Sequence, residues 1–173
     1  VGHPVKLSMG RKDVFEATGP TSGSHMRAKI GATKDGKIKA VQMFVAFEAG
    51  AYPGAPVAGG TNCVLGPYKV ENFKIDGYDV VVNKPKTAAY RAPGAPITAF
   101  ALEPVIDEIA KKLDMDPMEF RLKNATEEGD RNVNGVAYQK IGCIEVEEAI
   151  LSSEHYNSPL EGPNRGRGVA MGY

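Results

Sequence analysis

The sequence predicts an α+β fold, with a strand-rich N-terminal half that contains a β-hairpin, followed by two to three helices. In residues 1–83, apolar and polar residues alternate in several runs, as they do in half-buried strands. A loop of prolines and small residues follows at 84–96, and from 97 to 153 the apolar residues recur at helical spacing. Small and apolar residues alternate again at 165–173, which predicts the start of a further strand.

The strongest strand signal is a hairpin centred on Lys34–Gly36. Asp-Gly tolerates positive φ and therefore favours a tight turn between two strands. The flanking runs 26–33 and 37–48 are its predicted arms. Two further strands are predicted at Val5–Met9 and 73–83, and an irregular loop at 50–60.

Three helices are predicted in the second half. Residues 97–113 carry an apolar stripe with charged residues around it. Pro104 lies inside this stripe, so either the helix begins near Leu102, or it is kinked at Pro104. Asp116-Pro117 predicts the start of a second helix, with aspartate as the N-cap, and a third is predicted at 144–153.

Composition excludes several classes of protein. Lys+Arg and Asp+Glu both number 21, so a formal net charge of zero argues against nucleic-acid or anionic-membrane partners. The apolar runs are too short to span a bilayer, and no signal peptide is visible. Cys63 and Cys143 lack metal-ligand spacing and are predicted to be free thiols, so we expect a cytoplasmic protein.

Motifs for catalysis or metal binding are absent from the sequence. Its three histidines are scattered and have neither metal-ligand spacing nor a paired nucleophile. No residue of the chain is therefore predicted to be catalytic or to bind a metal.

The most unusual stretch is the end of the 84–96 loop, where Arg91 stands alone among small residues and prolines just before a helix. Backbone N–H groups near a helix start suit an anionic or oxygen-rich ligand, and glycine permits unusual dihedrals. The guanidinium of Arg91 would add a permanent charge and a planar fork of donors. The alternative is a tight strand-to-helix connection in which Arg91 caps carbonyl groups.

Tyr90–Pro96, the helix after it, and the D-P-x-E-x-R-x-x-N pattern of Asp116–Asn124 resemble the molybdenum-binding large subunit of the xanthine dehydrogenase/aldehyde oxidase family. Gly2–Lys6, Arg11–Phe15 and Gly50–Tyr52 also fall at family positions. The resemblance covers nearly the whole chain in the same order. It implies that the chain is an internal fragment, one lobe of a larger molybdopterin-binding domain, and we expect its cut surfaces to expose apolar area and to drive self-association.

The resemblance also implies site residues. Arg91, Ala92 and Gly94 would contact a molybdopterin-type molybdenum cofactor, and Pro93 would line the substrate pocket. Purine-oxidising members have an aromatic residue at the position of Pro93 and a guanidinium within 54–60, and this chain has neither. Ile97 stands where the family often has glutamine. Glu103 is expected to support its helix, and Tyr90 is expected to pack.

The implied activity is oxidation of a small organic substrate, of aldehyde or N-heterocycle type, with water as the oxygen source. The general-base glutamate and a glycine-rich cofactor segment would lie outside residues 1–173, so the fragment alone is expected to be inactive. The implied partners are the remainder of the large subunit and the iron–sulfur clusters and FAD of partner domains or subunits, in an oligomeric enzyme. The main alternative is a non-catalytic α+β binding or assembly module whose Arg91 loop grips an anion; a phosphate-binding enzyme of another kind is a weaker option.

Overall fold

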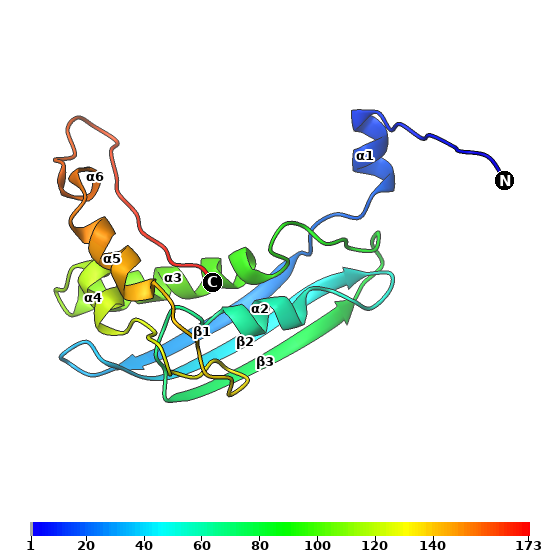
Figure 1. Cartoon of the computed structure of the whole chain (residues 1–173). Helices are drawn as coiled ribbons and strands as arrows, with labels where there is room; N and C mark the ends of the chain where they lie inside the picture. The colour runs from blue at the N-terminus through cyan, green and yellow to red at the C-terminus, as the bar shows by residue number, and fades with distance from the viewer. Residues whose placement is uncertain (1) are drawn as a thin grey trace.

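The computed structural model describes residues 2–173 and confirms the α+β fold (Figure 1). Strands dominate the first half of the described chain and helices the second. In chain order the elements are α1 (Arg11–Ala17), β1 (Ser24–Ala32), β2 (Ile38–Gly50), α2 (Val57–Cys63), β3 (Asn72–Val81), α3 (Ala95–Lys112), α4 (Pro117–Lys123), α5 (Cys143–Leu151) and α6 (Glu154–Asn157).

The strands form one sheet in the order β1-β2-β3. β1 and β2 are antiparallel, with Lys29 opposite Gln42, which confirms the predicted hairpin. β3 runs parallel to β2, with Asp76 opposite Phe44, and confirms the strand predicted at 73–83. α2 lies in the crossover between these parallel strands, because a parallel pair cannot be joined by a tight turn.

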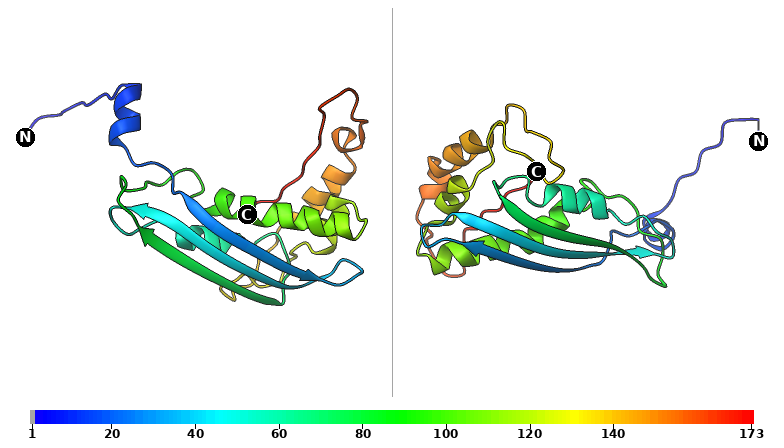
Figure 2. Two further views of the ribbon diagram at one scale, coloured as in Figure 1. Left: turned by 180° about the vertical axis from the view of Figure 1, so that it is seen from behind. Right: turned by 90° about the horizontal axis from the view of Figure 1, so that it is seen from below.

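The core lies between the sheet and the helices α2 and α3, which cover the same face (Figure 2). Alternate residues of β2 point into it, from Val41 to Phe47, at 0–3% exposure. They meet Leu102, Ile106 and Ala110 of α3. Burying each large side chain contributes about 1.5–3 kcal/mol, so this contact fixes α3 on the sheet.

The turn of the hairpin is held by hydrogen bonds to the residue that follows α4. Gly36 has a φ of +87°, as the predicted Asp-Gly turn requires. The amide of Asn124, which follows α4, accepts from the Ile38 N–H at 2.8 Å and donates to the Gly36 carbonyl at 2.8 Å. This side chain therefore joins the strand-rich half to the helical half.

α3 runs without interruption from Ala95 to Lys112, with Pro104 in its interior. The alternative in which the helix begins near Leu102 is wrong. Pro104 is exposed, so water can reach the helix on the side where its missing N–H leaves a carbonyl without its usual partner.

The second and third predicted helices are confirmed. Asp116 caps α4, and its Oδ1 accepts from the backbone N–H groups of Met118 at 2.7 Å and Glu119 at 3.1 Å. α5 spans Cys143–Leu151, close to the predicted 144–153. No helix within residues 2–173 is both long and apolar enough to cross a membrane.

Two strand predictions are wrong, and one loop prediction is confirmed only for residues 51–56. Val5–Met9 is extended but pairs with no strand, and Val5 and Leu7 are 78% and 85% exposed on an arm that leads away from the sheet (Figure 1). The predicted loop at 50–60 contains the start of α2. Residues 165–173 form no strand either; the Val169 carbonyl and the Met171 N–H bond to the side chains of Arg121 and Glu103.

Candidate cofactor-binding loop

The loop between β3 and α3 is fixed at its start to the end of β2. The backbone N–H and the hydroxyl of Thr87 both donate to the Ala49 carbonyl, at 3.0 and 3.2 Å. The N–H of Ala88 donates to the Pro20 carbonyl at 2.9 Å. Gly50 permits the close approach, since a Cβ there would lie 2.1 Å from the Pro85 carbonyl oxygen.

The end of the loop is fixed to α2. Gly94 has a φ of +89°, and a Cβ there would meet the Pro56 carbonyl oxygen at 2.4 Å and the Gly60 nitrogen at 2.6 Å. The hydroxyl of the fully buried Thr98 lies 3.2 Å from the Gly60 carbonyl oxygen and 3.2 Å from that of Gly94. Glycine is therefore required at 94 by both conformation and space.

The tip of the loop, residues 88–93, is exposed, but its backbone is conformationally constrained. Ala92 adopts a left-handed φ of +57°, which is unusual for a residue with a side chain and costs on the order of 1 kcal/mol. Its carbonyl accepts from the Ala95 N–H at 3.2 Å, which closes a turn directly before α3. The two anchored ends therefore hold the tip in one conformation.

The hydrogen-bond donors of this tip are free. Within residues 2–173, the backbone N–H groups of Arg91, Ala92 and Gly94 donate to no acceptor of the chain. The Arg91 side chain makes neither a hydrogen bond nor an ion pair in the same range. The alternative in which Arg91 caps carbonyl groups is therefore wrong for the described chain.

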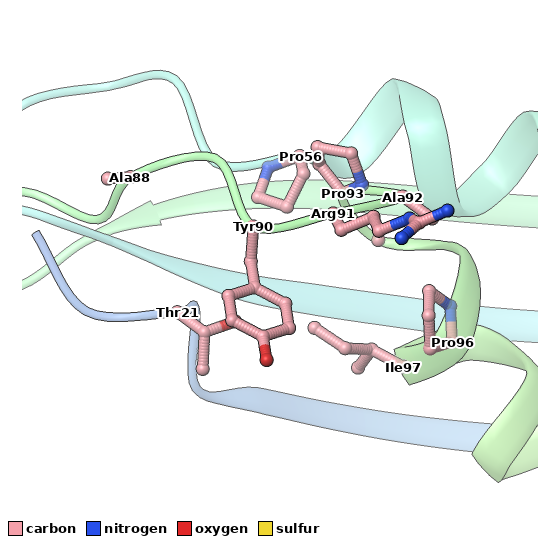
Figure 3. Close-up of a pocket in the computed structure, with 10 residues that line it drawn as sticks. Thr21, Pro56, Ala88, Tyr90, Arg91, Ala92, Pro93, Pro96 and Ile97 are labelled. Carbon is pink, nitrogen blue, oxygen red and sulfur yellow. The ribbon is translucent and has the colours of Figure 1, made fainter.

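A pocket of about 480 Å³ opens at the tip (Figure 3). The ring of Tyr90 projects from the loop toward Thr21 and Ile97. Tyr90 is 74% exposed, so the expectation that it packs is wrong. The lining residues are Thr21, Pro56, Ala88, Tyr90, Arg91, Ala92, Pro93, Gly94, Pro96 and Ile97.

This lining brings together all four residues predicted for the cofactor and the substrate pocket. Arg91 is its only charged member, and no carboxylate faces it. The pocket is otherwise built largely of apolar and small side chains. It therefore suits a ligand that has an anionic or oxygen-rich part and an apolar or planar body.

A second group of polar residues, which the sequence does not reveal, is buried between α3 and α4. Arg121 is fully buried, and its Nη2 donates to Glu103 at 2.9 Å. The hydroxyl of Tyr68 donates to the other oxygen of Glu103. Burial, together with the charge of Glu103, raises the pKa of Tyr68 far above its usual range, so its phenol stays a neutral donor. Glu103 thus supports its helix, as expected, by pairing with α4.

The two stretches that resemble the family have different roles: Tyr90–Pro96 lines the pocket, and Asp116–Asn124 supports the fold. In D-P-x-E-x-R-x-x-N, Asp116 caps α4, Arg121 pairs with Glu103, and Asn124 holds the hairpin turn. All three are structural. The only local signal for a buried Arg121 is its position one helical turn before Asn124 on the packed face of α4.

Comparison with known proteins decides the family. Residues 1–125 match the family model described as the molybdopterin cofactor-binding domain. The chain belongs to the molybdopterin cofactor-binding domain family. The chain is 34% identical, over 84% of its length, to the nicotinate dehydrogenase large molybdopterin subunit of Eubacterium barkeri. It is 32% identical, over 98% of its length, to the putative xanthine dehydrogenase molybdenum-binding subunit of Escherichia coli K12.

Solved structures agree with this assignment. The aldehyde oxidoreductase of Desulfovibrio gigas superimposes on 81% of this chain with a TM-score of 0.76 and 28% identity. This chain spans 35% of the Eubacterium relative, 24% of the Escherichia relative and 16% of the solved chain. It is therefore similar to one part of much longer proteins.

Proposed function

We propose that these residues form part of the catalytic subunit of a molybdenum-dependent hydroxylase, in which the Arg91 loop holds the molybdopterin-type cofactor. The observation that carries the proposal is the convergence of a free guanidinium and three free backbone N–H groups at the start of α3. Donors that have no partner in the described chain and lie in a loop that lines a pocket are suited to phosphate or pterin oxygens.

The cofactor fits the residues present. Gly94 lets the end of the loop pack against α2, so that Arg91 and Ala92 line the pocket, and Arg91 supplies a charge opposite to that of a phosphate. When bound, the cofactor would supply the redox chemistry that oxidises a small organic substrate with water as the oxygen source. The residues of this chain would bind and orient the cofactor and shield it on one side.

Pro93 is the proposed contact to substrate, together with Ile97, which also lines the pocket. Both line the pocket and offer no polar group. An aldehyde or an N-heterocycle is therefore the substrate class we propose. Neither an aromatic residue at 93 nor a guanidinium within 54–60 is present to hold a purine.

Further parts of the enzyme would lie outside these residues. We infer that the partners are the remainder of the large subunit and the iron–sulfur and FAD domains or subunits, in an oligomer, without a nucleic-acid or membrane partner. The length of the relatives supports additional protein around this domain. The two free cysteines, Cys63 and Cys143, support the cytoplasm as its compartment.

Oxidation in isotopically labelled water tests the proposal. The longer protein that contains this domain would be expressed in a host that makes the cofactor, then given an aromatic aldehyde in H₂¹⁸O and an artificial electron acceptor. We expect ¹⁸O in the carboxylic acid, and a loss of turnover in Arg91→Ala but not in Arg27→Ala, on the outer face of the sheet. A loaded protein that oxidises neither an aldehyde nor an N-heterocycle would favour the non-catalytic binding module.

A further inference from the structure

The buried guanidinium of Arg121 has no donor left over. Its Nε and Nη2 donate to Glu103 at 3.1 and 2.9 Å, and Nη1 donates to Asp107 at 2.7 Å and to the Pro117 carbonyl at 3.1 Å. Nη2 also donates to the Val169 carbonyl at 3.1 Å. An arginine has five N–H groups, and all five are used.

Two of the contacts around this ion pair come from the tail, residues 166–173. Besides the Val169 carbonyl on Arg121, the backbone N–H of Met171 donates to Glu103 at 2.8 Å. The ring of Tyr173 then packs against Gly66 and edge-on to Tyr138 at 5.7 Å. The tail therefore completes the hydrogen bonds of the buried pair, and the pair holds the tail.

A third carboxyl group is buried beside this pair. Glu147 of α5 is 1% exposed. One of its oxygens accepts from the Cys143 thiol at 3.6 Å, and Oε2 has no partner within residues 2–173. The titratable groups that face it are Arg121 of α4, Glu103 of α3, Tyr68 before β3 and Cys143 of its own helix.

An ionised Glu147 has no adequate donor in this arrangement. Burial raises the pKa of Cys143 to about 11, so the thiol is a weak neutral donor. The Tyr68 hydroxyl is committed to Glu103, and Arg121 is fully committed. A buried carboxylate without donors costs several kcal/mol, so the site accepts the neutral acid much better than the anion.

We propose that Glu147 is a protonation-controlled latch: its neutral form keeps α5 and the tail docked, and its ionisation releases them. Ionisation leaves two routes to relief. Either α5 opens to water, or Arg121 turns from the tail and Glu103 toward Glu147. The second route breaks the hydrogen bonds that hold Val169 and Met171, and the first frees α5, which is followed along the chain by α6 and the tail. The latch is independent of any cofactor at the Arg91 loop.

The expected pH range follows from the carboxyl group. Burial raises the pKa of Glu147 from its usual 4.5 to about 7 in the docked state. A group whose docked pKa is raised stabilises docking fully below about pH 4.5 and loses that contribution as the pH rises to 7. Between pH 5 and pH 8, the equilibrium constant for opening should rise about 70-fold.

Hydrogen–deuterium exchange of the 173-residue chain tests the latch. Protection factors of the tail amides, corrected for the pH dependence of intrinsic exchange, are measured from pH 5 to pH 8. We expect the wild-type protection factor of the Met171 amide to fall about 70-fold, and Glu147→Gln to remove this dependence. Glu145→Gln, on the exposed face of the same helix, is the matched control and should behave as the wild type.

A direct titration removes any reliance on the variant. Carboxyl ¹³C NMR of the wild type should give a midpoint for Glu147 near 7. A midpoint below about 5.5 would overturn the latch. An unchanged pH dependence in Glu147→Gln would do the same.

Discussion

At the scale of the residue, two arginines that lie thirty residues apart have opposite environments and opposite roles. Arg91 has its guanidinium in solvent at the rim of a pocket and no partner within residues 2–173, whereas Arg121 is fully buried with every N–H used. A buried charge needs paired hydrogen bonds, and an exposed one does not. The first arginine is therefore free to bind a ligand, and the second is part of the scaffold.

Arg121→Met should destabilise the fold strongly. It leaves Glu103 buried without its cation, and breaking such a pair costs about 3–5 kcal/mol. Urea unfolding at pH 7 measures the free energy of unfolding. Arg27→Met, at an exposed position of β1, is the control and should change it by less than about 0.5 kcal/mol. A loss below about 1 kcal/mol for Arg121→Met would contradict the assignment of the pair, and Glu103→Gln in the same chain should restore part of the loss.

Gly94→Ala should destabilise the chain and alter the loop. The methyl group would meet the Pro56 carbonyl at a left-handed φ, at a cost of roughly 1–3 kcal/mol. Gly142→Ala serves as the control, because Gly142 has a φ of −99° and open space around it. Thermal unfolding of both variants distinguishes them, and equal melting temperatures would show that the loop end is not fixed against α2.

At the scale of the element, the sequence predicts those turns and helix starts that depend on hydrogen bonds between neighbouring residues. The Asp-Gly turn and the Asp116-Pro117 helix start are confirmed because their hydrogen bonds close within a few residues. The strand predicted at Val5–Met9 is not formed, because alternating apolar and polar residues make a strand only where another strand is available to pair. Pro104 does not mark the start of α3, because burial of Leu102 and Ile106 on the sheet keeps the helix continuous through this proline.

For the candidate site too, the sequence predicts the local features but not the long-range contacts. Its location could be predicted from the composition of residues 84–96 and the helix start that follows. Its anchoring could not, because Pro20, Ala49 and Gly60 are far away in the sequence and contact the loop only in the fold. The buried pairing of Arg121 was missed for the same reason.

Asp116→Ala should shorten or loosen α4. It removes the cap of two backbone N–H groups and the acceptor of the Tyr156 hydroxyl, at 2.8 Å, for a loss of roughly 1–2 kcal/mol. Asp116→Asn retains a capping oxygen and should lose less than half as much. Guanidinium unfolding followed by far-UV circular dichroism gives both values, and identical losses in the two variants would argue against the cap.

At the scale of the whole molecule, apolar side chains lie uncovered on several faces. Leu7 and Phe15 on the N-terminal arm are 85% and 78% exposed, and Phe100 on α3 is 80% exposed. The chain spans only 35% of the Eubacterium relative, 24% of the Escherichia relative and 16% of the solved aldehyde oxidoreductase chain. Under the proposed function, the remainder of the large subunit would cover these residues.

The 173-residue chain should therefore self-associate as its concentration rises. Sedimentation velocity would show the mean sedimentation coefficient increasing with concentration, and Leu7→Ser with Phe15→Ser should reduce the increase, because less apolar area is left to bury. Lys12→Ser on the same arm is a polar control. A monomer at high concentration would contradict this prediction.

The most direct test of the central claim is the molybdenum content of the longer protein that contains this domain, purified from a host that makes the cofactor. The account predicts close to one molybdenum per chain in the wild type and in Arg27→Ala, and a clearly lower content in Arg91→Ala, since losing a hydrogen bond to a charged group, roughly 1.5–3 kcal/mol, weakens cofactor binding about tenfold or more. Molybdenum retained in full by Arg91→Ala would contradict it, and would leave the Arg91 loop as part of the scaffold.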